Sequence, residues 1–311
     1  MMNFSHKSVL LDETIEALNI HPDGIYLDGT LGGAGHSEQI VKRLTTGTLI
    51  GIDRDEVALS AARQRLSPYG ERVVTVHSNF CELADVLDRL SIPFVDGMLF
   101  DLGVSSPQLD DAQRGFSYMA DAPLDMRMDR SQSLSAYEVV NGWPQEELRR
   151  ILYDYGEERY APQIAAAMVR RREKQSIETT MELVEVIRSA MPAQALREKQ
   201  HPAKRSFQAI RIAVNDELGA VDRMLQVAFD RLKPGGRIAI ITFHSLEDRI
   251  VKSRMQAAAR GCICLPEFPV CVCGRKPVVR LVTRKPVVSG EEELEENPRA
   301  RSAKLRVAEK L

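Results

Sequence analysis

The sequence predicts an α/β fold, in which a parallel sheet is covered by helices on both faces and interrupted by an all-helical insertion. Over the first hundred residues, short apolar runs alternate with segments of helical spacing. Such near-continuous apolar strands, each followed by a helix, are typical of a buried parallel sheet. The alternation stops near Asp110 and resumes after Arg205. We therefore expect residues 1–110 and 206–311 to form one domain, with a helical domain at 111–205.

Hydrophobic periodicity places the individual elements. Four apolar runs in the first part indicate strands, at residues 25–28, 48–53, 73–76 and 97–101. Helical spacing follows the first three strands, at residues 36–44, 58–66 and 83–90. The insertion offers helices at 136–140, 145–153, 162–172 and 181–190, and no convincing strand. After it come a long helix at 207–232 that could break near Gly219, a strand at 237–243, a helix at 246–260 and a final strand at 303–308.

The composition limits the class of protein. Of 311 residues, 44% are hydrophobic, which is enough to fill a core. The 42 Lys and Arg against 44 Asp and Glu exclude a globally basic nucleic-acid binder, although a local basic face remains open. No apolar run approaches the roughly 20 residues of a membrane span, and Asp12 and Glu13 interrupt the apolar start. The odd count of five cysteines does not suggest a secreted disulfide scaffold, so we expect a cytoplasmic protein.

Polar groups follow the predicted strands at the edge where an open α/β sheet binds ligands. The first strand leads into Asp28 and a loop with glycines at 29, 32, 33 and 35. Glycines let the backbone approach a ligand, and the next helix offers its free N–H groups. Asp53 ends the second strand, where an acid suits ribose hydroxyls, and Phe80 follows the third, where a ring could cover an adenine. Because Asp101 ends the fourth strand at the same edge, the pattern indicates a nucleotide cofactor rather than only a tight turn.

Two cofactors suit this outline, a nicotinamide dinucleotide and S-adenosylmethionine. The loop lacks the dinucleotide fingerprint G-x-G-x-x-G, because Gly33-Ala34-Gly35 continues as His36-Ser37-Glu38. The turn Lys233-Pro234-Gly235-Gly236 before a strand is similar to the late turn of class I methyltransferases. These two observations favour S-adenosylmethionine. A nicotinamide-dependent oxidoreductase and a non-catalytic RNA-binding assembly factor stay as alternatives.

The segment from Asp101 to Asp110 is a polar loop of small residues, where a target group would meet the cofactor. An exocyclic base amine needs hydrogen-bond acceptors that turn its lone pair toward the methyl group. Methylation at pyrimidine C5 would instead need a cysteine nucleophile in this loop, and none is there. We interpret Cys81, after the third strand, as a small buried hydrophobe. The pattern therefore predicts direct attack by an amine, with Asp101 as the candidate catalytic residue.

Seven longer segments carry a more specific pattern. They are Asp28–Ser37, Asp101–Asp110, Arg114–Ser117, Pro123–Met128, Tyr155–Arg159, Phe243–Arg249 and Asn297–Ser302. With matches that extend from His6 to the C-terminal end, the chain resembles the RsmH (MraW) family of bacterial 16S ribosomal RNA cytosine-N4 methyltransferases. The resemblance implies a class I, Rossmann-like methyltransferase sheet and S-adenosylmethionine as cofactor. It also implies N4-methylation of a cytidine in the decoding region of small-subunit (16S) rRNA.

The resemblance further implies a set of cofactor contacts. They are Ala34, Gly35, His36, Asp53, Phe80, Asp101 and Gln108. His36 and Gln108 rest mainly on the resemblance, whereas most of the others follow from the strand ends. The implied partner is 16S rRNA within the small ribosomal subunit, not DNA and not a membrane, and a homo-oligomer is left open.

The insertion holds a local excess of positive charge. Residues 163–205 carry nine Lys and Arg and five acids, a net charge of +4. RNA phosphates would favour such a face, although a charge run can also be a solvated helix surface. The candidate RNA-binding residues are Arg170, Arg171, Arg172, Lys204 and Arg205.

Two cysteine pairs lie near the C-terminal end. Cys262 and Cys264 are separated by six residues from Cys271 and Cys273. Four thiols from two close pairs can form a tetrahedral zinc site of a structural kind. Such a cluster is not a general feature of the family, and unligated thiols in a surface loop are the alternative.

Overall fold

The computed structural model describes residues 8–264, 270 and 272–311, and the chain forms two compact units. Residues 1–103 and 218–311 make up the first unit, and Val104–Glu217 the second. The helical insertion expected at 111–205 falls inside the second unit, which extends beyond both of those ends. Cys271, one of the four predicted zinc ligands, lies outside the described residues.

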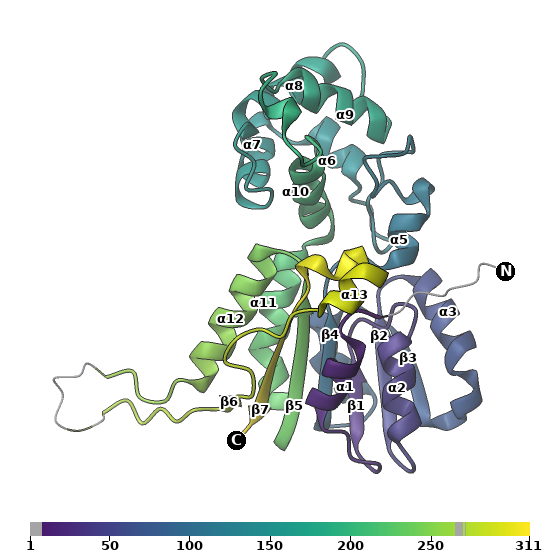
Figure 1. Cartoon of the computed structure of the whole chain (residues 1–311), viewed down its shortest axis with the longest axis vertical. Helices are drawn as coiled ribbons and strands as arrows, with labels where there is room; N and C mark the ends of the chain where they lie inside the picture. Colours follow the sequence, from purple (N-terminus) through teal and green to yellow (C-terminus); the bar gives the residue numbers. More distant parts are fainter. Residues whose placement is uncertain (1–7, 265–269, 271) are drawn as a thin grey trace. The chain divides into compact units, whose positions relative to one another are not determined.

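The first unit is built on a seven-stranded sheet with the order β3-β2-β1-β4-β5-β7-β6 (Figure 1). Its strands are β1 Ile25–Asp28, β2 Thr48–Asp53, β3 Val73–His77, β4 Val95–Asp101, β5 Leu232–Thr242, β6 Val279–Leu281 and β7 Lys304–Lys310. The first five are parallel, which confirms the α/β class. The sequence left the direction of the final strand open, and β7 runs antiparallel to both β5 and β6. An apolar run predicts a strand but not its direction, since only the pairing partner decides it.

Helices cover both faces of this sheet. They are α1 Leu11–Leu18, α2 Gly35–Arg43, α3 Glu56–Leu66, α4 Leu83–Arg89, α11 Glu217–Ala228, α12 Ser245–Ala259 and α13 Glu291–Glu296. Successive strand residues enter opposite layers, as the two-residue period of a strand requires. Tyr26 and Leu99 pack with α1, α2 and α3, whereas Leu27 and Phe100 pack with α4, α11 and α12. Both faces are therefore buried, which explains why the strands read as continuous apolar runs.

The second unit is helical around a core of its own. Its helices are α5 Ser106–Asp110, α6 Ala136–Gly142, α7 Gln145–Asp154, α8 Ala161–Arg172, α9 Thr180–Ser189 and α10 Lys204–Asn215. Capping boxes start α6 and α9, where Ser135 pairs with Glu138 and Thr179 with Glu182. The four helices predicted from periodicity correspond to α6, α7, α8 and α9. No helix of the described residues is long and apolar enough to cross a membrane.

The helix predicted over 207–232, for which a break near Gly219 was left open, is divided three residues earlier, at Asp216. The structure has two helices there, α10 and α11, with Asp216 between them in the left-handed region at φ 47°. Asn215 explains why α10 ends here. Its Oδ1 accepts from the Met128 N–H at 2.8 Å, and its Nδ2 donates to the Met126 carbonyl at 2.8 Å. Phe207 and Ile210 belong to the core of the second unit, which is why α10 lies with the insertion. Gly219 lies inside α11 and breaks nothing.

Candidate functional site

Three acids lie at the carboxyl end of three neighbouring strands. Asp53, Asp28 and Asp101 end β2, β1 and β4, which are adjacent in the sheet. Because these strands are parallel, their last residues share one edge, which is where open α/β sheets bind ligands. The sequence prediction that these strand ends meet is therefore confirmed for the acids.

Two of these acids hold the glycine loop in place. The buried Asp28 accepts from the Thr30 N–H at 3.1 Å and from the Ser37 hydroxyl at 2.7 Å. Asp53 accepts from the Gly32 N–H at 2.7 Å through Oδ2 and from the Asp55 N–H at 2.9 Å through Oδ1. The loop between β1 and α2 is thus fixed at both sides before any ligand binds.

The loop leaves part of its backbone accessible. A Cβ added at Gly33 would meet nothing within 4 Å, whereas one at Gly29 would come within 2.3 Å of the Phe100 ring. Ala34, the N-cap of α2, is buried and has a left-handed φ of 59°. Gly35 lies under the N-terminal segment, because an added Cβ there would be 1.9 Å from the Ser8 hydroxyl. The most open position of the loop is therefore Gly33, just before the predicted contacts Ala34, Gly35 and His36, and its carbonyl accepts from Arg65 at 2.9 Å.

His36 and Asp101 face each other at this edge. The buried His36 ring has its Nε2 3.1 Å from the Val9 carbonyl and its Nδ1 3.8 Å from the Asp101 Oδ2. A carbonyl only accepts, so we assign the ring proton to Nε2, which leaves Nδ1 as an acceptor. Burial lowers the pKa of His36 to about 4, which keeps the ring neutral near pH 7.

Asp101 is held by its backbone and leaves an oxygen unpaired. Its N–H donates to the Thr30 hydroxyl at 2.6 Å, which ties β4 to the glycine loop. Burial raises the pKa of the Asp101 carboxyl to about 8, with further contributions from the charges of Asp28 and Glu247. Within the part of the chain that the structure describes, its Oδ1 is shielded from solvent and has no hydrogen-bond partner. A donor or a cationic group placed here would be favoured, because an unmet buried acceptor is costly.

Phe80 and Cys81 lie after β3, as predicted. Phe80 is nearly buried and packs edge to face on Phe100, with ring centroids 6.0 Å apart. Asn79 caps the short turn that follows by accepting from the Cys81 N–H at 3.1 Å. Cys81 is half-buried and packs against the sheet core, with its Sγ 3.8 Å from Arg223.

Gln108 belongs to the second unit. It is buried in α5, where its Oε1 accepts from the Ser105 N–H at 3.0 Å. The expected cofactor contact of Gln108 therefore stays a prediction.

The five candidate RNA-binding residues divide into two kinds. Arg171 donates to the Gln175 carbonyl at 2.6 Å, and Arg172 to the Val140 carbonyl at 2.8 Å, so both side chains brace their own unit. Arg170 is exposed at the end of α8. Lys204 and Arg205 are exposed in the first turn of α10, where the helix dipole disfavours positive charge. Arg205 also donates to the Glu157 carbonyl at 3.2 Å, so it contributes a contact within its own unit.

Sequence reasoning missed two features of the site. Thr30 joins the loop to β4 through the Asp101 N–H, and its only signal was its place in the Asp28-Gly29-Thr30 run. The N-terminal segment, through Ser8 and Val9, covers Gly35 and binds the His36 ring, and no local pattern predicts this packing.

The sheet, the loop and the strand-end acids define a class I methyltransferase that uses S-adenosylmethionine. The residues fit this cofactor, because the space at Gly33 lets a ligand approach the loop and the unpaired Asp101 oxygen suits a ligand that carries positive charge. The chain belongs to the MraW methylase family, whose model matches residues 3–311.

Several relatives align with the chain over its whole length. A protein of Brevibacillus brevis named ribosomal RNA small subunit methyltransferase H is 57% identical over 311 residues, covering 100% of this chain and 99% of its own. The protein of that name from Carboxydothermus hydrogenoformans is 57% identical over 310 residues, with coverage of 100% and 99%. The one from a Paenibacillus species is 57% identical over 315 residues, with coverage of 99% and 100%.

Proposed function

We propose that this protein methylates the exocyclic N4 amine of a cytidine in the decoding region of 16S rRNA. The pair formed by His36 and Asp101 is the observation that carries the proposal. The His36 Nδ1 and the Asp101 carboxyl face each other 3.8 Å apart at the edge of the sheet, and both are acceptors once Asp101 is ionised. Two acceptors in that position suit a ligand that offers N–H donors. The names of the full-length relatives specify small-subunit rRNA as their substrate, and we extend that substrate to this chain.

The cofactor would be held by the residues at the first three strand ends. The backbone around Gly33, Ala34 and Gly35 would approach its methionine part, and Asp53 would bind the ribose hydroxyls. Phe80 would lie against the adenine. When bound, S-adenosylmethionine supplies an electrophilic methyl group on a positively charged sulfur.

The Asp101 carboxylate would orient the reacting amine. The lone pair of a cytosine N4 is delocalised into the ring, so acceptors on its N–H groups are needed to turn it toward the methyl group. The amine then attacks directly, and no covalent intermediate with the enzyme forms. The loop from Asp101 to Asp110 holds no cysteine that could act as a nucleophile.

The helical unit would bind the RNA. Arg170, Lys204 and Arg205 present exposed positive charge, and the first turn of α10 adds the positive end of a helix dipole. Tyr118 and His201 stack within this unit, with ring centroids 4.6 Å apart and planes inclined by 16°. Such a stacked pair can continue onto an unstacked base of single-stranded RNA. The partner is then 16S rRNA in the small ribosomal subunit, and the protein acts in the cytoplasm.

The decisive experiment supplies purified protein and S-adenosylmethionine to small ribosomal subunits that lack the modification. The rRNA is digested to nucleosides, which are compared by mass spectrometry with N4- and C5-methylcytidine standards. We expect N4-methylcytidine, and an Asp101→Asn variant serves as the inactive control.

Other products would overturn parts of the proposal. A C5-methyl product would contradict direct attack by the amine. If competent subunits gain no methyl group although the protein binds S-adenosylmethionine, the non-catalytic assembly factor becomes the better interpretation. Binding of NADH in place of S-adenosylmethionine would favour the interpretation as a nicotinamide-dependent oxidoreductase.

A further inference from the structure

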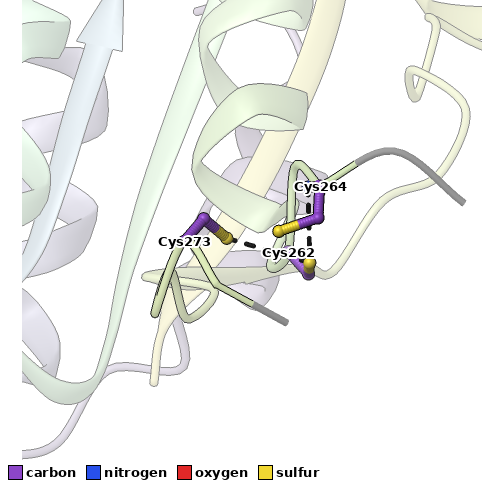
Figure 2. Close-up of side chains that lie close together, drawn as sticks. All are labelled: Cys262, Cys264 and Cys273. Carbon is purple, nitrogen blue, oxygen red and sulfur yellow. Dashed lines mark hydrogen bonds between the residues drawn. The ribbon is translucent and has the colours of Figure 1, made fainter. Parts of the chain in front are cut away.

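Three cysteine thiols converge in the segment that joins α12 to β6. The Sγ atoms of Cys262, Cys264 and Cys273 all lie within 4.8 Å of one another (Figure 2). We call residues 260–264 and 272–278 the cysteine arm. Cys262 and Cys264 lie on the segment that leaves α12, and Cys273 lies on the segment that returns to β6, so the cluster joins two parts of the chain.

The sulfur spacing fits a shared metal ion better than a disulfide. The Sγ atoms of Cys273 and Cys262 are 3.8 Å apart, whereas a disulfide bond is about 2.05 Å long. Thiolates bound tetrahedrally to zinc at about 2.3 Å lie about 3.8 Å from one another. The observed pair therefore already has the spacing of two ligands on one ion.

Backbone donors point at two of the sulfurs. The Cys264 N–H lies 3.4 Å from the Cys262 Sγ, and the Val272 N–H lies 3.4 Å from the Cys264 Sγ. Hydrogen bonds to a charged group favour its charged form, and zinc binds the thiolate rather than the thiol. The backbone is thus arranged to support negative sulfur.

The side chains of the arm favour a metal ion that prefers sulfur ligands to oxygen ligands. Arg260, Arg275 and Lys276 lie in the arm, and its described residues include no Asp or Glu. Without oxygen ligands there is little to hold Mg²⁺ or Ca²⁺, whereas sulfur ligands select zinc. The positive side chains would balance the charge of several thiolates on one divalent ion.

The arm has little else to hold it together. At its base the Val278 N–H donates to the Ala258 carbonyl at 2.8 Å and Arg275 to the Ala257 carbonyl at 3.1 Å. Beyond the base, Ile263 is 50% exposed and Val272 76% exposed, so these apolar side chains bury little surface. Figure 1 shows the arm leading away from the end of α12. A segment without a core of its own is where a structural metal contributes most to order.

The cluster is separate from the candidate methyl-transfer site. β5 ends at Thr242 on the edge that carries Asp101, and α12 then runs back along the sheet for 15 residues. At 1.5 Å per residue this is about 22 Å. The cysteine arm starts where α12 ends, on the opposite edge, so a metal there would not take part in methyl transfer.

We propose that Cys262, Cys264 and Cys273 bind one structural Zn²⁺ that closes the cysteine arm. The proposal does not depend on the RNA substrate or on the reaction. Cys271 is the neighbour of this set in the sequence and lies outside the described residues.

The test measures metal in the full-length protein, expressed with added zinc and freed of any purification tag. Elemental analysis by mass spectrometry should find about one zinc per chain in the wild type. Cys262→Ser and Cys273→Ser should each lower this at least fivefold. Cys81→Ser is the matched control, since it removes a thiol from the sheet unit, and it should keep the full zinc content.

A second measurement covers the case in which the serine variants fold poorly. Zinc is removed from the wild type with a chelator under reducing conditions, and Co²⁺ is added. We expect thiolate-to-cobalt absorption in the near ultraviolet and the visible bands of tetrahedral Co²⁺. Hydrogen exchange should show faster exchange in the cysteine arm of the metal-free protein and unchanged exchange in β1 and β4.

Two results would overturn the proposal. One is a wild type that, prepared with zinc, holds less than a tenth of an equivalent and gives no thiolate–cobalt bands. The other is a Cys262→Ser or Cys273→Ser variant that keeps as much zinc as the Cys81→Ser control.

Discussion

The Nδ1 of the neutral His36 ring lies 3.8 Å from the Oδ2 of Asp101, and neither atom carries a proton once Asp101 ionises, which it does above its raised pKa of about 8. The His36 ring is oriented by the Val9 carbonyl, and the backbone N–H of Asp101 is fixed by the Thr30 hydroxyl. The ring and the backbone that carries the carboxyl are therefore positioned before a ligand arrives. Such positioning is what makes electrostatic stabilisation effective, because no reorganisation is needed during the reaction.

Asp101→Asn should lower the rate of methyl transfer by about 100-fold or more, in line with the loss of one oriented electrostatic group. The amide keeps one acceptor oxygen but replaces the other with an NH2 donor and removes the negative charge, so it would hold the N–H groups of the target amine less well. The rate is measured in single turnovers, and cofactor affinity by calorimetry. Asp23→Asn, an exposed acid before β1, is the control. An Asp101→Asn enzyme with the wild-type rate would contradict the assigned role.

The stability of the ligand-free protein should fall as the pH rises toward 8. The pKa of Asp101 is raised in the folded state, to about 8, from a usual value of 3.8. Because its pKa is raised, the Asp101 carboxyl binds its proton more tightly in the folded state than in the unfolded state. Its contribution to the free energy of unfolding is therefore full below about pH 4 and is lost as the pH rises through 8. Denaturant unfolding between pH 5 and pH 9 measures this, and Asp101→Asn should flatten the slope. An unchanged slope in the variant would show that another group is responsible.

Cofactor affinity should change with pH in the opposite sense. S-adenosylmethionine carries positive charge, which an ionised Asp101 attracts and a protonated one does not. Affinity should therefore increase from pH 6 to pH 8.5, with proton release on binding. Calorimetry in two buffers of different ionisation enthalpy measures the released proton. If no proton is released near pH 7, the carboxyl is already ionised in the free protein.

His36 should destabilise the fold in acid. Burial lowers its pKa from 6.5 to about 4, so the folded state binds this proton less readily than the unfolded chain. The stability contributed by the neutral ring is present above pH 6.5 and is lost as the pH falls through 4. His36→Gln keeps an N–H for the Val9 carbonyl and cannot titrate. Unfolding experiments from pH 7 to pH 4 should show that this variant loses less stability than the wild type. An equal loss of stability would exclude His36 as the group responsible.

Asn215→Ala should destabilise the helical unit by about 2–4 kcal/mol, because two buried backbone groups lose their partners. These groups are the Met128 N–H and the Met126 carbonyl. Urea unfolding followed by circular dichroism measures the change. Gln200→Ala, an exposed amide in the same unit, should stay within about 0.5 kcal/mol of the wild type.

The exposed basic residues at the start of α10 should act on the binding of RNA. Lys204→Ala with Arg205→Ala should raise the KM for small subunits several-fold, reduce the salt dependence of binding, and leave cofactor affinity unchanged. Arg149→Ala, an exposed arginine paired with Glu146, is the control. Arg172→Ala should instead lower the melting temperature, because it removes the bond to the Val140 carbonyl. Equal KM values for the double variant and the control would show that the start of α10 does not contact the RNA.

The sequence by itself determined the α/β class, the first five strands, the helices of the insertion and the acids at the strand ends. These are local properties, because apolar periodicity and turn residues act over a few positions. Asp28, Asp53 and Asp101 share an edge simply because the strands that carry them are parallel neighbours.

Only the tertiary structure decided what depends on contacts distant in sequence. The direction of β7 follows from its pairing with β5, and the break between α10 and α11 from the anchoring of Asn215 on residues 126–128. The same holds for the shifted pKa of Asp101, which is caused by burial beside Asp28 and Glu247. No local pattern encodes such effects, because burial and charge depend on which distant segments pack around a residue.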